Sequence, residues 1–153
     1  MEHPASSGSQ ANERLARTLA HAVEHAGKPR HRIASAAGMH RETLLRVTRG
    51  ERPIGLDEAS RVLLACGAFP KATMVLALTG EEALAREWMC SEMGAFLEDF
   101  LMALPGELET ALGARACDLR PRWAVGTSRL IARALAKHVE EYADRDPSIL
   151  AGR

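Results

Sequence analysis

Apolar residues recur at spacings of three and four along most of this chain, which is typical of amphipathic helices. The first such face begins after Asn12, and its members are Leu15, Leu19, Val23 and Ala26. Four shorter faces follow before residue 80. Their inward residues are Ile33, Ala34 and Ala37, then Leu44 and Val47, then Ala59, Val62, Leu63 and Cys66, and finally Met74, Val75 and Leu78. The pattern therefore predicts five helices in the first half of the chain.

Glycine and proline separate these faces. Gly27, Gly38, Gly50, Gly67 and Gly80 each follow an apolar face, where a residue that tolerates a left-handed backbone ends a helix. Pro29 and Pro70 fit the first turn of the helices that follow them, and Asp57 is a good N-cap. The third helix is expected over residues 41–49.

The second half has longer patterns. Residues 81–104 read as one helix with an apolar stripe of Met89, Met93, Phe96, Leu97, Phe100, Leu101 and Leu104. Pro105 and Gly106 predict its end, a short helix with Leu108, Ala111 and Leu112 follows, and Pro121 opens a last helix. One face of that last helix carries Thr127, Leu130, Ile131, Ala134, Leu135, Val139 and Tyr142.

Composition supports an all-α fold, because Ala and Leu dominate while β-branched and aromatic residues are few. We expect a five-helix domain over residues 11–80 and a three-helix C-terminal bundle over residues 81–145 that serves dimerisation or regulation. Residues 1–10 are small and polar and are predicted to be a disordered tail, and residues 146–153 a flexible one.

The net charge of zero hides three blocks of alternating sign. Residues 28–53 carry a net charge of +5, residues 81–109 carry −7, and residues 110–137 carry +5. The first block coincides with two short helical patterns that meet at Gly38, and its basic residues are Lys28, Arg30, Arg32, Arg41, Arg46, Arg49 and Arg52. A basic helix–turn–helix segment is suited to binding the groove of duplex DNA.

The segment IASAAGMHRETLLRVTRGERP resembles the helix-turn-helix of the Xre-type regulators, which include the lambda and 434 phage repressors and Cro. Ile33 and Ala34 match the first aliphatic–alanine pair, Gly38 the turn, and Leu44 and Val47 the inward positions of the second helix, which Gly50 closes. The resemblance covers about residues 12–78. It implies a lambda-repressor-like DNA-binding domain, whereas the C-terminal half resembles no family.

In that family the third helix enters the major groove, so the resemblance implies base contacts from Arg41, Glu42 and Arg46. Their chemistry fits, because an arginine fork can bond guanine O6 and N7, and Glu can accept from cytosine N4. The resemblance further implies phosphate contacts from Arg30, His40, Arg49 and Arg52. Thr48 and Leu45 depart from the family pattern, in which Glu is frequent at the first position and a small or polar residue at the second.

Other chemistry is weakly indicated. His21 and His25 share one helical face, but two histidines without a third ligand are more often surface residues than a metal site, so no metal or cofactor is expected. Cys66, Cys90 and Cys117 lack metal-binding spacing and are expected to be small core residues. No convergent nucleophile and base are seen, so an enzyme is not expected.

The expected function is sequence-specific binding of double-stranded DNA in transcription regulation, as a homodimer. The stripe, represented by Met89, Met93, Phe96, Leu97, Phe100 and Leu101, and the last helix are the candidate dimer interface. Two alternatives remain. One is an antitoxin-type or adapter protein that binds DNA for autoregulation and whose C-terminal helices bind a protein partner. The other is a ligand-responsive regulator with a cavity beside Trp88 or Trp123, although both are more simply core residues. With no signal-like segment and no membrane span, a cytoplasmic, nucleoid-associated protein is expected.

Overall fold

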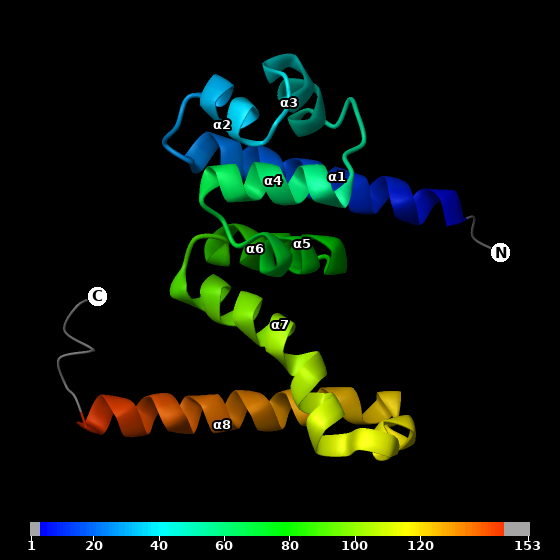
Figure 1. Ribbon diagram of the computed structural model, residues 1–153, viewed down its shortest axis with the longest axis vertical. Coiled ribbons are helices and arrows are strands. Elements are labelled where there is room, and N and C mark those ends of the chain that lie inside the picture. The colour runs from blue at the N-terminus through cyan, green and yellow to red at the C-terminus, as the bar shows by residue number, and fades with distance from the viewer. Residues whose placement is uncertain (1–3, 146–153) are drawn as a thin grey trace. The chain divides into compact units, whose positions relative to one another are not determined.

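The computed structural model describes residues 4–145, and every element of regular structure in that range is a helix. The α-helices are α1 (Pro4–His25), α2 (Arg30–Ala36), α3 (Arg41–Thr48), α4 (Leu56–Cys66), α5 (Pro70–Thr79), α6 (Glu82–Trp88), α7 (Glu92–Leu112) and α8 (Ala124–Arg145) (Figure 1). Two short 3₁₀ helices, Gly113–Asp118 and Pro121–Trp123, lie between α7 and α8. The all-α prediction is confirmed. In the described part of the chain, no helix has the length and apolar character that crossing a membrane requires.

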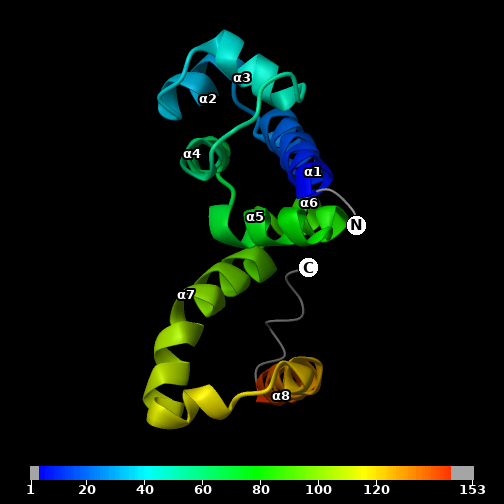
Figure 2. The ribbon, with the colours of Figure 1, turned by 90° about the vertical axis from the view of Figure 1, so that its right-hand side faces the viewer.

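The described part of the chain forms two compact units, which divide between Pro105 and Gly106. In the first unit, α1 packs against α3, α4, α5 and α6, while α2 packs against both α3 and α4. Figure 2 shows α2 and α3 side by side at one end of this unit. The unit extends beyond the predicted boundary near Gly80, because α6 packs on α5 and α1.

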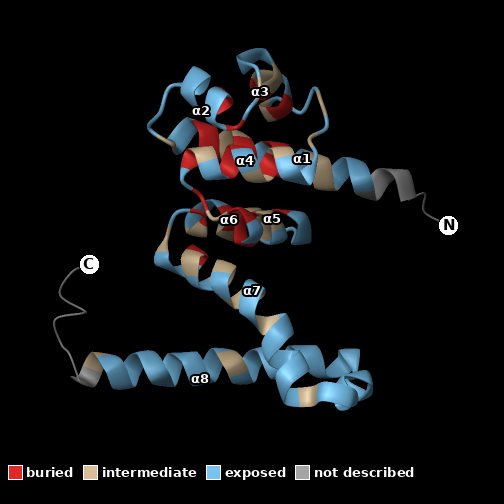
Figure 3. Ribbon diagram, in the orientation of Figure 1, coloured by how far each residue is buried: buried red, intermediate tan, exposed pale blue. Residues whose placement is uncertain are grey.

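The core of the first unit lies among α1 to α4, as the buried segments in Figure 3 show. Leu19, Ile33, Val47, Val62 and Leu63 are completely buried, and Leu44 is nearly so. The inward faces predicted for the first four helices are confirmed, because the other members, Leu15, Val23, Ala34, Ala37, Ala59 and Cys66, are also buried, with Ala26 packed at the edge. Leu44 and Val47 therefore determine which face of α3 points away from the core of the first unit.

The fifth helix packs the predicted Met74 against the core, but its other buried residues differ from those predicted. Val75 is 42 % exposed and Leu78 is 37 % exposed, while the small residues Ala72, Thr73 and Ala77 are buried. Small side chains let α5 lie close to α1, α4 and α6, so the larger aliphatic residues point outward. The prediction that Val75 and Leu78 face inward is therefore wrong.

The predicted starts of two helices are also wrong. The helix that begins at Pro4 includes residues 4–10, which were expected to be disordered, whereas residues 1–3 and the predicted tail at 146–153 lie outside the described residues. Proline suits the first turn of a helix, where its missing N–H has no intrahelical partner. The N-cap of α4 is Gly55 rather than Asp57, and the Glu58 carboxylate accepts a 3.5 Å hydrogen bond from the Gly55 N–H.

The predicted single helix over residues 81–104 is broken at Met89–Ser91, between α6 and α7. The Ser91 hydroxyl accepts a 3.2 Å hydrogen bond from the Gly94 N–H and so caps α7. The same hydroxyl donates to the Trp88 carbonyl at 3.0 Å. In contrast, Pro105 does not end α7, which continues to Leu112. Proline removes one backbone donor, and here the helix continues past that missing bond.

The second unit has no packed bundle core. Among its described side chains none is buried, and Val125, Leu130 and Val139 of α8 are each at least 60 % exposed. The predicted three-helix bundle is not confirmed, because α6 packs within the first unit and no described side chain of the second unit is buried. Trp123 is 48 % exposed, which corrects its assignment as a core residue.

Candidate nucleic-acid interface

The candidate interface is built on α2, the turn after it, and α3. Gly38 has a φ of +67°, a left-handed conformation that a side chain would strain, and its N–H donates to the Ser35 carbonyl at 3.1 Å. The Met39 N–H donates to the Ala34 carbonyl at 2.9 Å, which completes the tight turn. The chain then enters α3 through His40, whose backbone is extended. The left-handed backbone of Gly38 therefore allows the tight turn between these two helices.

One face of α3 is fixed to the core and the other is free. Leu44 and Val47 are buried, with 1 % and 0 % exposure, against the remaining helices of the first unit. On the opposite face, Arg41, Glu42 and Arg46 are all exposed. At 100° per residue they fall within one side of the helix. The structure thus brings together the three residues that were predicted to contact bases, at the N-terminal end and middle of α3.

These three side chains are not engaged with the rest of the protein. In the part of the chain that the structure describes, no side-chain hydrogen bond or ion pair involves Arg41, Glu42 or Arg46. Their guanidinium and carboxylate groups keep their full bonding capacity toward solvent or a bound molecule. An arginine that supports the fold would instead be expected to bond a carboxylate or a carbonyl.

The four residues predicted to contact phosphate are in different situations. Arg30 begins α2, and Arg49 follows the last residue of α3. Both line a cavity of about 220 Å³ that Glu24 and Thr48 also line, so the structure brings these two arginines together. Arg49 also lies 3.9 Å from the Glu51 carboxylate, and its side chain remains 62 % exposed. His40 is exposed at the N-cap position of α3 and makes no capping hydrogen bond.

Arg52 is held more firmly than the others. Its Nη2 donates to Glu58 Oε1 at 3.3 Å, and the side chain is only 39 % exposed. Lys28, which contributes to the basic block, is also occupied, because its ammonium donates to the Ala65 carbonyl at 2.8 Å near the end of α4. A cation at the C-terminal end of a helix is stabilising, because it interacts with the carbonyl groups that have no partner within the helix. Part of the +5 charge of residues 28–53 therefore supports the fold.

Arg61 was not predicted from the sequence and lies beside the turn. Its Nη1 is 3.2 Å from the position that a Cβ on Gly38 would occupy. This exposed residue of α4 adds a positive charge next to the junction of α2 and α3. The helical period of the sequence places Arg61 on the outward face of α4, but its proximity to Gly38 depends on tertiary packing and could not be predicted.

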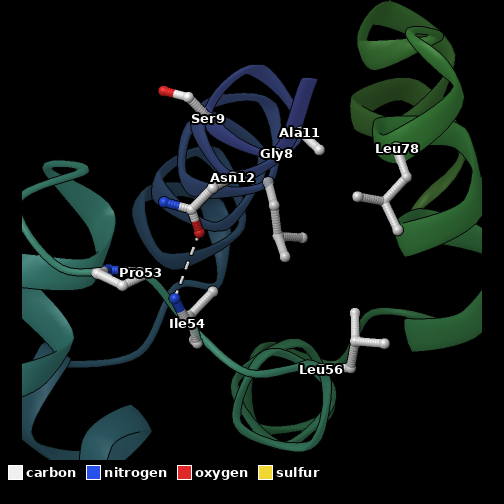
Figure 4. A pocket seen from close by; sticks show the side chains of 9 residues that line it. Gly8, Ser9, Ala11, Asn12, Pro53, Ile54, Leu56 and Leu78 are labelled. Atoms are coloured by element: carbon white, nitrogen blue, oxygen red, sulfur yellow. Dashed lines mark hydrogen bonds between the residues drawn. The ribbon is translucent and has the colours of Figure 1, made fainter. Parts of the chain in front are cut away.

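The loop that follows α3 is anchored to α1. Asn12 Oδ1 accepts a 3.3 Å hydrogen bond from the Ile54 N–H, as Figure 4 shows. Around this bond lies an open cavity of about 530 Å³, lined mainly by the apolar side chains of Leu15, Ile54, Leu56 and Leu78. The ligand cavity that was considered beside the tryptophans differs from this one, since neither Trp88 nor Trp123 lines it.

The candidate dimer stripe is partly corrected. Met89 is 5 % exposed and packs in the core of the first unit, so it offers no surface to a second subunit. Met93 and Phe96 of α7 are 48 % and 42 % exposed, whereas Leu97, Phe100 and Leu101 are half-buried. The Phe96 and Phe100 rings stack with centroids 5.9 Å apart. The exposed stripe therefore begins at Met93.

Comparisons with known proteins identify no relative. No protein-family model matches the chain, and no curated protein sequence or solved structure shows significant similarity to it.

Proposed function

We propose that this protein is a sequence-specific DNA-binding regulator of transcription, of the Xre or lambda-repressor-like type, that inserts α3 into the major groove. The observation that carries the proposal is the exposed, unbonded set of Arg41, Glu42 and Arg46 on the helix that follows the Gly38 turn. In helix-turn-helix proteins the second helix of the pair presents its N-terminal residues to base edges. The free face of α3 carries the donors and the acceptor that such readout uses.

Specific contacts would come from the two arginines and the glutamate. Arg41 and Arg46 each offer a planar fork that matches O6 and N7 of guanine, and Glu42 can accept from N4 of cytosine. The proposed operator therefore contains G·C pairs at the positions that α3 reads. A good bidentate contact contributes roughly 1–3 kcal/mol of discrimination against the wrong base.

Arg30, His40 and Arg49 would contact phosphates on either side of α3. They flank it at the start of α2, at the N-cap and at the C-terminal end. Such contacts orient the protein on the duplex and do not depend on sequence. Arg52 would contribute less, because Glu58 already neutralises its guanidinium.

A homodimer is part of the proposal, because one recognition helix reads only a few base pairs. The exposed apolar residues Met93 and Phe96 support a second subunit on α7. A two-fold dimer presents two copies of α3, which suits an operator of pseudo-palindromic sequence.

The experiment selects bound duplexes from a randomised DNA pool and then measures affinity for the enriched sequence by fluorescence anisotropy. Arg41→Ala and Arg46→Ala are each expected to weaken operator binding by about tenfold or more and to leave binding to random DNA almost unchanged. Arg49→Ala is expected to weaken binding to both DNAs and to lower the slope of log affinity against log salt by about 1.

Arg122→Ala is the matched control, since it removes one exposed positive charge from the second unit. It is expected to keep operator affinity and the preference over random DNA. Failure of the pool to enrich any sequence, or wild-type operator affinity in both α3 variants, would contradict the proposal.

A second candidate function is an adapter or antitoxin-type protein that binds a protein partner through its C-terminal helices. The large exposed side chains of α8, Leu130, Val139 and Tyr142, favour it, because isolated proteins seldom leave such a surface uncovered. Because this candidate also binds DNA for autoregulation, enrichment of a sequence fits both candidates, and failure to enrich one would count against both.

A further inference from the structure

Cys66 and Cys90, which are 24 positions apart in the chain, line one small cavity of the first unit. The cavity has a volume of about 180 Å³, and His21, His25 and Met89 also contribute to its lining. Cys66 is the last residue of α4 and is 7 % exposed, whereas Cys90 lies in the break between α6 and α7 and is exposed. The expectation that all three cysteines are core residues is therefore wrong for Cys90 and for Cys117, which is also exposed.

The backbone segments that carry the two thiols are in direct contact. The Phe69 N–H donates to the Met89 carbonyl at 2.8 Å. This bond joins the turn that follows Cys66 to the residue that precedes Cys90. Burial raises the pKa of the Cys66 thiol to about 11, while the charge of Lys28 opposes this increase and that of Cys90 adds slightly to it.

A metal ion is a poorer occupant of this cavity than its side chains first suggest. In the described residues, no three His, Cys, Asp or Glu side chains converge on a point that could hold a metal. The rings of His21 and His25 stack with centroids 3.9 Å apart, and His25 Nδ1 is 2.9 Å from the His21 carbonyl oxygen. The positively charged Arg86 lines the same cavity. Two free thiols on neighbouring backbone segments line this same cavity.

We propose that Cys66 and Cys90 are a modification site that closes to an intramolecular disulfide when the protein meets a small oxidant of the disulfide class, such as glutathione disulfide. The exposed Cys90 thiolate attacks one sulfur of the oxidant, and a glutathione thiolate leaves. Cys66 then loses its proton to solvent and attacks the Cys90 sulfur, and the second glutathione thiolate leaves. One oxidant molecule is reduced to two thiols, and two protein thiols are oxidised to one disulfide.

The order of attack follows from exposure and acidity. Cys90 is open to solvent and meets the oxidant first, whereas the buried Cys66 is largely protonated at neutral pH because its pKa is about 11. The closing step therefore depends on a small thiolate fraction. Its rate is expected to rise about tenfold for each pH unit between pH 7 and pH 9. The linked protein has the end of α4 joined covalently to the break between α6 and α7.

The test uses the full chain with Cys117→Ser, which removes the third thiol and keeps the proposed pair. The protein is incubated with glutathione disulfide and quenched with acid, and its intact mass and cross-linked peptides are determined. The expected product is a monomer lighter by two hydrogen atoms, with residues 66 and 90 in one linked peptide. The matched variants add Cys66→Ala or Cys90→Ser to the same background.

Cys66→Ala is expected to stop at a glutathione adduct on Cys90, and Cys90→Ser to remain largely unmodified. A Cys90 adduct that persists at pH 9 in the Cys117→Ser protein overturns the proposal, and so does a disulfide between two chains. A closing rate that does not change with pH overturns the assigned order of attack. These outcomes do not depend on whether the protein binds DNA.

Discussion

The two compact units share the same helical patterning but differ in what covers their apolar faces. In the first unit, Leu19, Ile33 and Leu63 are completely buried among side chains from four helices. In the second unit, Leu130 is 63 % exposed and Val139 is 64 % exposed, although both lie on a long amphipathic helix. An amphipathic pattern therefore predicts a helix in both units, but it predicts a core only where several such helices follow one another at short intervals.

Connection length accounts for part of this difference. In the first unit, turns of a few residues join helices of 7 to 11 residues from α2 to α6, so apolar faces from neighbouring elements are brought together. In the second unit, α8 has 22 residues and the segment before it is formed by two short 3₁₀ helices. A single long helix cannot bury its own apolar face.

The largest expected effect is on the free energy of unfolding when one leucine of each unit is replaced by alanine. Leu19→Ala is expected to lower the free energy of unfolding by about 3–5 kcal/mol, because it leaves a cavity in a close-packed core. Leu130→Ala in α8 is expected to cost less than about 0.5 kcal/mol, since an exposed leucine loses little burial. Urea denaturation, monitored by circular dichroism, measures the free energy of unfolding of both variants. Equal losses would mean that α8 has a covered face in solution.

The next effect concerns the exposed apolar surfaces themselves. Phe96→Asp on α7 is expected to raise the dissociation constant of the proposed homodimer at least tenfold, since a charge in an apolar contact is strongly disfavoured. Val125 of α8 is 60 % exposed, and Val125→Asp is the matched variant, which is expected to leave the dissociation constant nearly unchanged. Analytical ultracentrifugation at micromolar concentration measures both constants.

The reverse result for these two variants would assign self-association to α8. A wild-type protein that stays monomeric would remove the homodimer from the proposed function. Thermal unfolding of Phe96→Asp is the control for folding, because Phe96 is 42 % exposed and its substitution is expected to preserve the fold.

The smallest expected effect is on the free energy of unfolding when one of two glutamates is replaced. Glu82 accepts hydrogen bonds of 3.0 and 2.8 Å from Arg17 and also lies near Arg14 and Arg86, whereas Glu141 of α8 pairs only with Lys137 at 3.7 Å among the described residues. Glu82→Gln is expected to cost about 1 kcal/mol at pH 7, and Glu141→Gln at most about 0.3 kcal/mol, because solvent screens an exposed pair.

The pH dependence sharpens this comparison. The hydrogen bond from Arg17 lowers the pKa of Glu82, with the charges of Arg17, Arg86 and Arg14 adding to the decrease. The folded protein therefore binds this proton less readily than the unfolded chain does. The stabilisation is complete above the ordinary pKa of 4.5 and is lost as the pH falls through the lowered value. The stability gap between wild type and Glu82→Gln is expected to close in acid, and a constant gap would contradict this cause.

The sequence predicted the first four inward faces and the helix ends at glycine, because both follow from local spacing. It also predicted that Arg41, Glu42 and Arg46 would share a helix, and the structure adds that they are exposed and unbonded. Whether they contact DNA stays a prediction. The inward and outward sides of α5 were not predictable in this way, since Ala72 and Ala77 are buried by close helix approach rather than by hydrophobic size.

Other features required tertiary information. The Glu98 carboxylate accepts a 2.7 Å hydrogen bond from the Ala72 N–H at the start of α5, so an acidic residue of α7 supports another helix. Lys28 bonds the Ala65 carbonyl, although its sequence context suggested a DNA-facing charge. The shared cavity of Cys66 and Cys90 likewise arises from contact between distant segments.

Gly94 sets a limit on how this chain can change during evolution. A Cβ at this position would collide with the Trp88 carbonyl oxygen and would lie 3.2 Å from the Phe69 ring, yet the backbone of Gly94 is not left-handed. At Gly106 and Gly126 an added Cβ would meet nothing within 4 Å. The requirement for glycine at position 94 is therefore one of volume rather than of backbone freedom. A single methyl group there would force the α6–α7 break to rearrange, so this junction can vary only if Trp88 moves with it.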